Sequence, residues 1–292
     1  MISIITSTYN REDLLPRMLQ SILNQTYSNW ELVLMDDGST DGTEKLIERY
    51  NDSRIRYFKG ENTGAAQKRN EGVSLAKGEY FIQLDSDDEV KEDWLEQFAK
   101  HINGDATYLI SCAWEKRDHN GNIVETSYPK NMGKMFDNIS INILSGSLLM
   151  NRKIFLETEG YDTKLNSGLH TEFLIRLVPV LRKHNVKVIT INKPLVVIHL
   201  HEGERMRSNF DAIYKGCTTT LKKHKELFEQ HPDMNFDYNT VAAVMALRTN
   251  RLKIARQYLQ KAIKIKPWRY KCYIWYIISY FPSIVERFYQ KK

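Results

Sequence analysis

The stretch 31–39 reads Glu31-Leu32-Val33-Leu34-Met35-Asp36-Asp37-Gly38-Ser39, an apolar run that ends in two aspartates and a glycine. A short apolar run closed by turn residues is typical of a buried strand. The same arrangement returns at residues 80–88, where Tyr80-Phe81-Ile82-Gln83-Leu84 leads into Asp85-Ser86-Asp87-Asp88. An apolar strand at residues 2–5 is likewise followed by the polar pair Tyr9-Asn10. Polar side chains are therefore expected at the ends of three strands.

Strands and helices alternate along the first hundred residues. Expected strands cover residues 2–5, 31–35, 55–58 and 80–84, and expected helices cover residues 13–25, 43–50, 64–76 and 92–101. Apolar side chains recur at helical spacing in the expected helices. This alternation predicts an α/β fold with a mostly parallel central sheet covered by helices on both faces.

The acidic segment 85–88 is a candidate cation site. Ligands of open parallel sheets bind outside the carboxyl ends of the strands, which is where this segment is expected. On an extended chain Asp85 and Asp87 point to the same side, and carboxylates suit Mg²⁺ or Mn²⁺. Such an ion would neutralise a diphosphate leaving group. The alternative is structural, because Asp88 or Glu89 would also suit the amino-terminal cap of the following helix.

Several segments of the first hundred residues together resemble glycosyltransferase family 2, in the order and spacing of that family. They are Ser3-Ile4-Ile5-Thr6-Ser7-Thr8-Tyr9-Asn10-Arg11, Leu23-Asn24-Gln25-Thr26-Tyr27, the stretch 31–41, Glu61-Asn62-Thr63-Gly64, Lys68-Arg69-Asn70-Glu71-Gly72, and Lys77-Gly78-Glu79-Tyr80 running into the acidic segment 85–88. The resemblance implies the GT-A fold, a single nucleotide-binding α/β domain. It also implies a metal-dependent, inverting transfer of a sugar from a nucleoside-diphosphate sugar to an acceptor hydroxyl.

The resemblance assigns roles to matching positions. Ser7 and Tyr9 would border the base, Asp37 would accept a hydrogen bond from it, Arg69 would lie near the nucleotide, Asp85 would face the ribose or sugar, and Asp87 would bind Mn²⁺ or Mg²⁺. An ionised carboxylate only accepts hydrogen bonds, so Asp37 favours uracil or thymine, whose N3 carries a proton. Guanine, with its N1–H, is the rival base. The structural alternatives are a core position for Tyr9 and a helix-surface ion pair for Arg69.

The general base is expected near residue 170. Gly146-Ser147-Leu148-Leu149-Met150-Asn151-Arg152 and Gly160-Tyr161-Asp162 resemble the acceptor side of the family's domain. Many members then carry an Asp that deprotonates the acceptor hydroxyl, and here His170 stands in its place. A histidine can abstract a proton near neutral pH. Glu172 is the other candidate, although it could instead pair with Arg176 one helical turn later.

The cluster His199-Leu200-His201-Glu202-Gly203-Glu204-Arg205-Met206-Arg207 is the next candidate. Members of the resembled family often have a histidine and a basic loop here that reach the diphosphate or the metal. His201 fits that position, and His199 would share its face of a strand. The alternative is a polar loop without a ligand.

A second, helical region is expected after the catalytic domain, so we place the domains at residues 1–205 and 206–292. Residues 242–267 loosely resemble a single tetratricopeptide unit, which cannot bury its own face and should pack on the rest of the protein. Residues 251–292 contain eleven Lys and Arg and one acid, Glu286. The net charge of +6 is therefore made of about +10 in this tail and about −4 elsewhere.

The basic tail also carries aromatic residues between 268 and 281, which suits an element at an anionic membrane surface. The apolar run is too short to span a bilayer. A helix buried against the body, with a solvated basic face, is the alternative. Three scattered cysteines and the absence of a signal segment at the start predict a cytoplasmic protein. The basic aromatic tail would make it peripheral at the inner face of the membrane.

The expected partners are a nucleoside-diphosphate sugar and a glycan or lipid-linked acceptor. The basic tail with its aromatic residues would allow nucleic acid, but none is expected, because the acidic rim of the first domain would repel phosphates unless a metal intervenes. A sugar nucleotidyltransferase is an alternative enzyme class. It would normally need a glycine-rich basic loop after the first strand, where this chain has Ser7-Thr8-Tyr9-Asn10. A catalytically altered protein that only binds sugar nucleotides is a third reading, suggested by His170.

Overall fold

A computed structural model of the chain describes residues 1–104, 106–200 and 209–290. By its internal contacts the chain forms two compact units. The first unit comprises Met1–Thr163 and Phe173–Glu202, and the second comprises Lys164–Glu172 and Gly203–Lys292. The segment before Phe173 thus belongs with the helical unit. The boundary at residue 205 that the sequence suggests stays a prediction.

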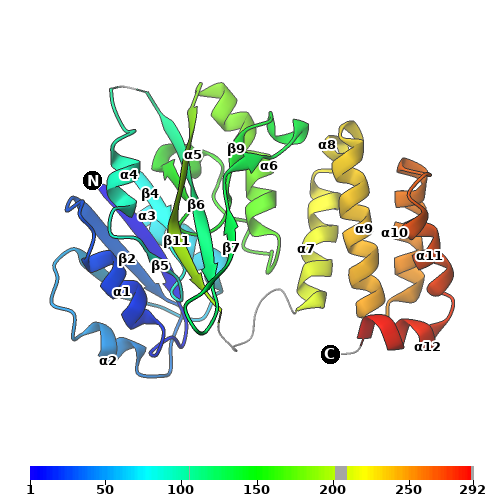
Figure 1. Ribbon diagram of the computed structural model, residues 1–292, viewed down its shortest axis with the longest axis horizontal. Helices are drawn as coiled ribbons and strands as arrows, with labels where there is room; N and C mark the ends of the chain where they lie inside the picture. Colours follow the sequence, from blue (N-terminus) through cyan, green and yellow to red (C-terminus); the bar gives the residue numbers. More distant parts are fainter. Residues whose placement is uncertain (105, 201–208, 291–292) are drawn as a thin grey trace. The chain divides into compact units, whose positions relative to one another are not determined.

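The first unit is built on one large sheet with the strand order β3-β2-β1-β4-β10-β6-β11-β5, and β7 pairs with β6 (Figure 1). Its strands are β1 (Ile2–Thr8), β2 (Trp30–Asp36), β3 (Ile55–Lys59), β4 (Tyr80–Gln83), β5 (Glu89–Val90), β6 (Tyr108–Arg117), β7 (Ile123–Ser127), β10 (Leu148–Asn151) and β11 (Lys187–His199). Strands β1 to β4 run parallel, and β6 and β11 also pair in parallel. The predicted α/β fold with a mostly parallel sheet is confirmed.

The antiparallel part of the sheet is due mainly to β10, which pairs antiparallel with both β4 and β6. A separate two-stranded sheet joins β8 (Lys130–Asn131) and β9 (Ser140–Ile141), on either side of a 3₁₀ turn at Lys134–Phe136. Strand β11 is long and contains Pro194 at a register irregularity. A proline is tolerated there because the ladder is already interrupted at an irregularity.

Helices pack on both faces of the sheet. They are α1 (Leu15–Leu23), α2 (Thr43–Ile47), α3 (Ala65–Leu75), α4 (Trp94–Ala99) and α5 (Arg152–Glu157). The apolar side of α1 is buried in the same core as Ile4 and Leu32. Helix α3 covers the other face, where Gly72 lies so close that a Cβ would meet Ile5 at 2.5 Å. The predicted helices are present, each somewhat shorter than its sequence pattern.

The second unit consists of helices, as the sequence predicts. They are α7 (Phe210–Lys223), α8 (Lys225–Gln230), α9 (Pro232–Arg248), α10 (Leu252–Ile265), α11 (Tyr270–Ile278), α12 (Pro282–Val285) and a π-helical turn at Glu286–Gln290. Helices α9 and α10 are joined by a short turn at residues 249–251, where Asn250 has a positive φ of 58°. Their shared core contains Phe236, Leu259 and Cys272. No described helix is long and apolar enough to cross a membrane.

Candidate active site

The carboxyl ends of β1, β2 and β4 form the rim that the sequence predicts. Parallel pairing places Thr8 opposite Asp36, so β1 and β2 end level, and it places Gln83, the last residue of β4, opposite Ile5 within β1. The pairing continues one residue beyond β2, because the amide of Asp37 donates to the carbonyl of Thr8 at 2.9 Å. Tyr9, Asp37 and Asp85 therefore follow neighbouring strand ends.

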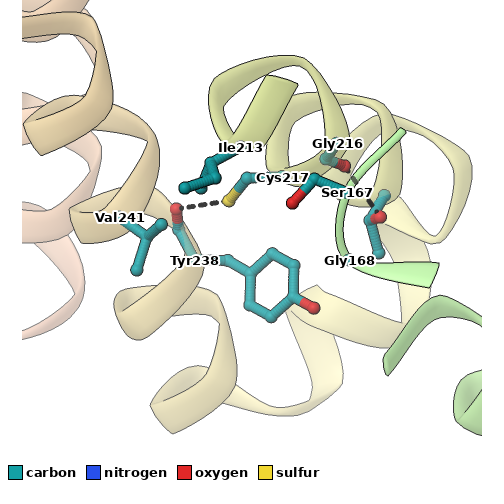
Figure 2. A pocket seen from close by; sticks show the side chains of 8 residues that line it. Ser167, Gly168, Ile213, Gly216, Cys217, Tyr238 and Val241 are labelled. Atoms are coloured by element: carbon teal, nitrogen blue, oxygen red, sulfur yellow. Dashed lines mark hydrogen bonds between the residues drawn. The ribbon is translucent and has the colours of Figure 1, made fainter. Parts of the chain in front are cut away.

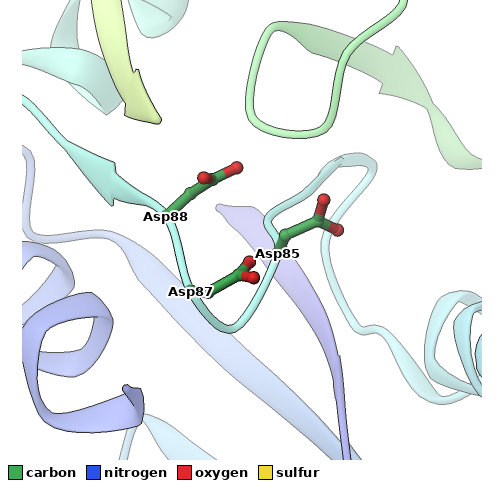
Figure 3. Close-up of side chains that lie close together, drawn as sticks. All are labelled: Asp85, Asp87 and Asp88. Carbon is green, nitrogen blue, oxygen red and sulfur yellow. The ribbon is translucent and has the colours of Figure 1, made fainter. Parts of the chain in front are cut away.

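Three carboxylates gather directly after β4 (Figure 3). One oxygen from each of Asp85, Asp87 and Asp88 lies within 4.8 Å of the others. Asp85 and Asp87 are half-buried, whereas Asp88 is buried. Burial raises the pKa of Asp88 well above its usual range, and the charges of Asp85 and Asp87 raise it further, against the opposing effect of Arg17. A group of hard oxygen donors at this spacing fits a divalent cation.

The cluster does not cap a helix, so the structural alternative for Asp88 and Glu89 is wrong. Strand β5 begins at Glu89, and α4 begins only at Trp94, after Asp93. The acidic turn is instead held by Arg17 of α1, whose Nη2 donates to the carbonyl of Asp87 at 2.6 Å. The sequence singles out Asp85 and Asp87 as the converging pair, and the geometry of the turn adds Asp88 to them.

Arg69 of α3 contacts the acidic cluster directly. Its Nη2 lies 2.7 Å from Oδ1 of Asp85, and the Arg69 side chain is 12% exposed. Burial alone would lower the pKa of Arg69, but the charge of Asp85 and its hydrogen bond, with the charge of Asp87, outweigh burial and raise it. The ion pair expected as the alternative for Arg69 therefore exists, but it is largely buried and lies at the candidate site.

Asp37 holds the loop that leads into α3. Its Oδ1 accepts from the amide of Thr63 at 2.6 Å, and its Oδ2 accepts from the amide of Gly64 at 2.9 Å. Gly64 has a φ of +95°, a conformation that favours glycine. An ionised carboxylate has about four acceptor positions, so these two bonds leave capacity for a ligand. The predicted contact between Asp37 and a base stays a prediction.

The residue before it, Asp36, has a role that the sequence does not reveal. It is fully buried, its Oδ1 accepts from the amide of Ser39 at 2.8 Å, and its Oδ2 accepts from the hydroxyl of Tyr57. Burial raises the pKa of Tyr57, and the bond to Asp36 raises it further, which keeps the phenol protonated. Asp36 thus fixes the turn that presents Asp37.

Ser7 and Tyr9 lie at the end of β1 as expected. Ser7 is half-buried and pairs with Met35, while the Tyr9 side chain is 46% exposed, so a core position for Tyr9 is wrong. The adjacent Asn10 adopts a positive φ of 51° and its Oδ1 accepts from the amide of Thr40 at 2.8 Å. This bond ties the end of β1 to the loop after β2.

The acceptor-side segment is joined to the same rim by Gln83 and Tyr161. The hydroxyl of Tyr161 donates to Oε1 of Gln83 at 2.8 Å, while Nε2 of Gln83 is buried without a hydrogen-bond partner. Asn70 of α3 exchanges two hydrogen bonds with the backbone of Tyr161, at 2.8 and 2.9 Å. No local sequence pattern reveals the roles of these residues, because the contacts join positions that are far apart along the chain.

His170 and Glu172 lie in the first turn of α6 (Leu169–Lys183), in the part of that helix that belongs to the second unit. His170 is half-buried. Glu172 is fully buried, and its Oε1 lies 2.9 Å from Nζ of Lys223 and 2.9 Å from Nε2 of His224. A buried carboxylate with two such partners suits a structural role, in which Glu172 attaches the start of α6 to the second unit.

The segment before α6 packs tightly on the helical unit (Figure 2). A Cβ on Gly216 would lie 2.2 Å from the carbonyl oxygen of Ser167, so only glycine allows this approach. Beside it lies a largely apolar cavity of about 220 Å³, lined in part by Ser167, Cys217 and Tyr238. The thiol of Cys217 donates to the carbonyl of Tyr238 at 3.1 Å. These contacts explain why residues 164–172 group with the second unit.

His199 ends β11 and its Nε2 lies 2.7 Å from Oε2 of Glu89. Burial lowers the pKa of His199, and this effect outweighs the opposing hydrogen bond to Glu89. His201, the predicted metal or diphosphate ligand, lies outside the described residues, so its role stays a prediction.

Comparison with known proteins agrees with this geometry. The family described as "Glycosyl transferase family 2" matches residues 3–159. The chain belongs to that family. It is therefore a glycosyltransferase, an enzyme that takes its sugar from a nucleotide sugar.

Among curated relatives, "Glycosyltransferase GlyG" of Streptococcus pneumoniae serotype 4 is 30% identical over 233 residues, which cover 72% of this chain and 74% of the relative. "Putative colanic acid biosynthesis glycosyl transferase WcaA" of Escherichia coli K12 is 27% identical over 239 residues, covering 79% and 83%. Among solved structures, residues 1–349 of Staphylococcus aureus TarS in complex with UDP-GlcNAc match with a TM-score of 0.64 at 18% identity, covering 99% of this chain and 91% of that one. This last likeness concerns the fold.

Proposed function

We propose that this glycosyltransferase transfers a sugar from a uridine or thymidine diphosphate sugar to a hydroxyl of a glycan or lipid-linked acceptor, with inversion and with a divalent cation. The observation that carries the proposal is the acidic cluster Asp85–Asp87–Asp88 beside Arg69, at the carboxyl ends of β1, β2 and β4. Ligands of sheets of this type bind outside such strand ends.

The cation would be Mn²⁺ or Mg²⁺, held chiefly by Asp87, with Asp85 and Asp88 beside it. The fit rests on three carboxylates whose oxygens approach within 4.8 Å and on a buried Asp88 whose charge is disfavoured by its neighbours. When bound, the ion would neutralise the charge that develops on the diphosphate leaving group. Arg69 would limit the repulsion within the cluster when it is empty. His201 is a further proposed ligand.

The donor base is proposed to lie against Ser7, Tyr9 and Asp37. Asp37 retains acceptor capacity after its two bonds to the Thr63–Gly64 backbone, which suits a base with an N–H donor. The TarS structure that this chain resembles in fold is a complex with UDP-GlcNAc, which favours uridine. The relative named for colanic acid biosynthesis favours a role in polysaccharide biosynthesis.

His170 is the proposed general base, because it stands at the position where many members of the family carry the aspartate that deprotonates the acceptor hydroxyl. Glu172 is a weaker candidate, because its carboxylate is fully buried and within 2.9 Å of both Lys223 and His224. A general base must reach the proton of its substrate. We therefore assign Glu172 the task of fixing the start of α6, and through it the neighbouring His170.

The tail is proposed to attach the enzyme to the cytoplasmic face of an anionic membrane. Trp268, Tyr270, Ile277, Phe281 and Phe288 are each at least 50% exposed. The other side of α11 is buried, since Cys272 belongs to the core of the second unit. Within α11 itself, Cys272 is buried whereas Tyr270 and Ile277 are exposed, so packing on the second unit leaves apolar side chains available for a membrane surface. Exposed aromatic side chains between basic residues suit the membrane interface.

A panel of nucleotides and metals tests the donor and the cofactor. The thermal shift of the protein would be measured with UDP, dTDP, GDP and CDP, each in Mn²⁺ and in EDTA, together with hydrolysis of the matching nucleotide sugars. We expect stabilisation by UDP or dTDP that depends on the metal. Preferential stabilisation by GDP or CDP would refute the base assignment, and equal stabilisation in EDTA would refute the metal dependence.

A further inference from the structure

The second unit contains a cavity of about 720 Å³ that the reaction described above does not use. Parts of α7, α8, α9 and α10 line it. Its volume lies within the usual range of small-molecule sites. Four lysines line it, namely Lys222, Lys225, Lys261 and Lys264, together with one acid, Glu229.

The positive charge of this lysine pocket is largely unneutralised by the protein. Among the described residues, no carboxylate lies within ion-pair distance of Lys222, Lys261 or Lys264. Lys225 lies 3.7 Å from Glu229, but the two side chains are 76% and 59% exposed, so the pair is weak. Other lysines of the second unit form ion pairs, for example Lys223 with Glu172 and Lys266 with Asp233.

The rest of the lining combines polar side chains with apolar ones, among them Leu221, Phe228 and Ile265, and one of the polar groups is held in place. Asn239 is buried and donates from Nδ2 to Asn235 at 2.7 and 2.8 Å, which sets the orientation of its amide. Tyr214 and Tyr258 pack edge to face, with ring centroids 6.4 Å apart. Hydroxyl and amide groups next to ammonium groups suit a ligand that is rich in hydroxyls and negatively charged.

We propose that this lysine pocket binds an acidic glycan, a saccharide chain that carries carboxylate or phosphate groups. The inference rests on the proposed glycan acceptor and names its chemical class. Nucleic acid fits less well, because single strands bind by stacking bases on exposed aromatic faces. Here Phe228 is 1% exposed, and Tyr214 and Tyr258 are partly buried and pack on each other.

Calorimetry on the full chain tests the proposal with defined probes. Hexagalacturonate supplies carboxylates, a glycerol-phosphate hexamer supplies phosphodiesters, and maltohexaose supplies a neutral saccharide. We expect binding of at least one acidic probe, weakened as salt is raised, and no comparable binding of maltohexaose. Inorganic phosphate should compete only at much higher concentration. Equal binding of maltohexaose would contradict the argument that charge drives binding. Tighter binding of an oligothymidylate of equal charge would contradict the assignment of the ligand as a glycan.

The paired variants locate the site. Lys261→Gln/Lys264→Gln should weaken binding of the acidic glycan about tenfold or more, since it removes two of the ammonium groups that have no carboxylate partner among the described residues. Lys45→Gln/Lys253→Gln removes the same charge from exposed lysines outside the pocket and should have little effect. An unchanged affinity in the first variant, or an equal loss in both, would refute the proposal. Metal-dependent UDP binding should be unchanged in both variants, so a failure of the donor site would be seen separately.

Discussion

The guanidinium of Arg69 lies 2.7 Å from Oδ1 of Asp85, so a cation from α3 partly neutralises the acidic turn after β4. The sequence places both residues near the nucleotide, but it does not show that they contact each other. The contact matters because Asp85, Asp87 and Asp88 would otherwise repel one another in a partly buried place. Arg69 and a divalent cation should therefore be partly interchangeable in stabilising the cluster.

Arg69→Met should lower the free energy of unfolding by about 1–3 kcal/mol in EDTA, because the carboxylates lose a buried partner while Asp85 stays partly hydrated. Millimolar Mn²⁺ should restore part of this loss. Thermal or urea unfolding with and without metal measures both effects. Arg49→Met is the matched control, since Arg49 is exposed. A loss of equal size with and without metal would contradict the idea that the cation substitutes for Arg69.

Asp87→Ala should weaken UDP binding in Mn²⁺ about tenfold or more, because the cation loses its main proposed ligand. The residual affinity should equal that of the wild type in EDTA. Calorimetry of UDP binding provides the measurement. Glu92→Ala, which removes an exposed acid a few residues along the chain, should behave as the wild type. If Asp87→Ala binds UDP in Mn²⁺ as tightly as the wild type, Asp87 is not a metal ligand.

The strand ends could be predicted from sequence because the decisive signals are local. The apolar run that precedes Asp85-Ser86-Asp87-Asp88 predicts a buried strand, and the acidic residues mark the point where that strand ends. The antiparallel pairing of β10 with β4 could not be read in the same way, because Leu149 and Ile82 are far apart in sequence. Registers of this kind depend on which distant surfaces pack together.

Contacts between buried polar side chains also could not be predicted from local sequence patterns. Asp36 looks like one more turn acid, yet it is fully buried and accepts a hydrogen bond from Tyr57. Glu172 looks like a surface acid of a helix, yet it is fully buried, with Nζ of Lys223 and Nε2 of His224 each 2.9 Å from its Oε1. In both cases the partner comes from another element, and only the packing of that element decides whether the carboxylate is solvated or buried.

Glu31 should make stability depend on pH. Its burial opposes ionisation, but hydrogen bonds from Ser3 and the amide of Lys77, with the charge and hydrogen bond of Arg56, lower its pKa overall. A lowered pKa gives stability that is present above the unfolded value of about 4.3 and lost as pH falls through the folded value. Glu31→Gln should therefore cost about 1–3 kcal/mol at pH 7, and less as pH falls below about 4.

Urea unfolding of the wild type and of Glu31→Gln between pH 3 and 7 measures this difference. Glu48→Gln, at an exposed position, provides the control for the loss of one acid. A destabilisation by Glu31→Gln that stays constant across the range, or grows toward low pH, would contradict the lowered pKa.

The exposed aromatic face of the tail should bind anionic membranes. Replacing Trp268, Ile277 and Phe281 by Ser should reduce co-sedimentation with vesicles that contain phosphatidylglycerol, with the fold intact, because these side chains are at least half exposed. Substitution is preferable to deletion of residues 264–292, since deletion would also remove the buried Cys272. Replacing Ile123, Val124 and Tyr128 by Ser, also at exposed positions, should not change sedimentation. Equal sedimentation of all three proteins would count against the membrane proposal.

Substitutions of His170 and Glu172 should have different effects, because His170 is the proposed general base and Glu172 is proposed to hold the start of α6. His170→Ala should lower turnover by about 10²-fold or more with UDP binding intact, because the acceptor hydroxyl loses its proton acceptor. The pH–rate profile of the wild type should rise near the ordinary pKa of histidine, about 6.5, rather than near about 4. His170→Asp, which restores the group usual in the resembled family, should retain more activity than His170→Ala.

Glu172→Gln should instead lower stability, by about 1–3 kcal/mol, since it removes the charge that Lys223 and His224 share. Lys223 is 38% exposed, so solvent limits this loss. Turnover per folded molecule should change far less than in His170→Ala, and the shape of the pH–rate profile should be kept. Unfolding curves and kinetics on the same samples distinguish the two roles. If Glu172→Gln is as stable as the wild type and inactive, while His170→Ala transfers sugar at the wild-type rate, then Glu172 is the base and the buried pairing described here rearranges when the acceptor binds.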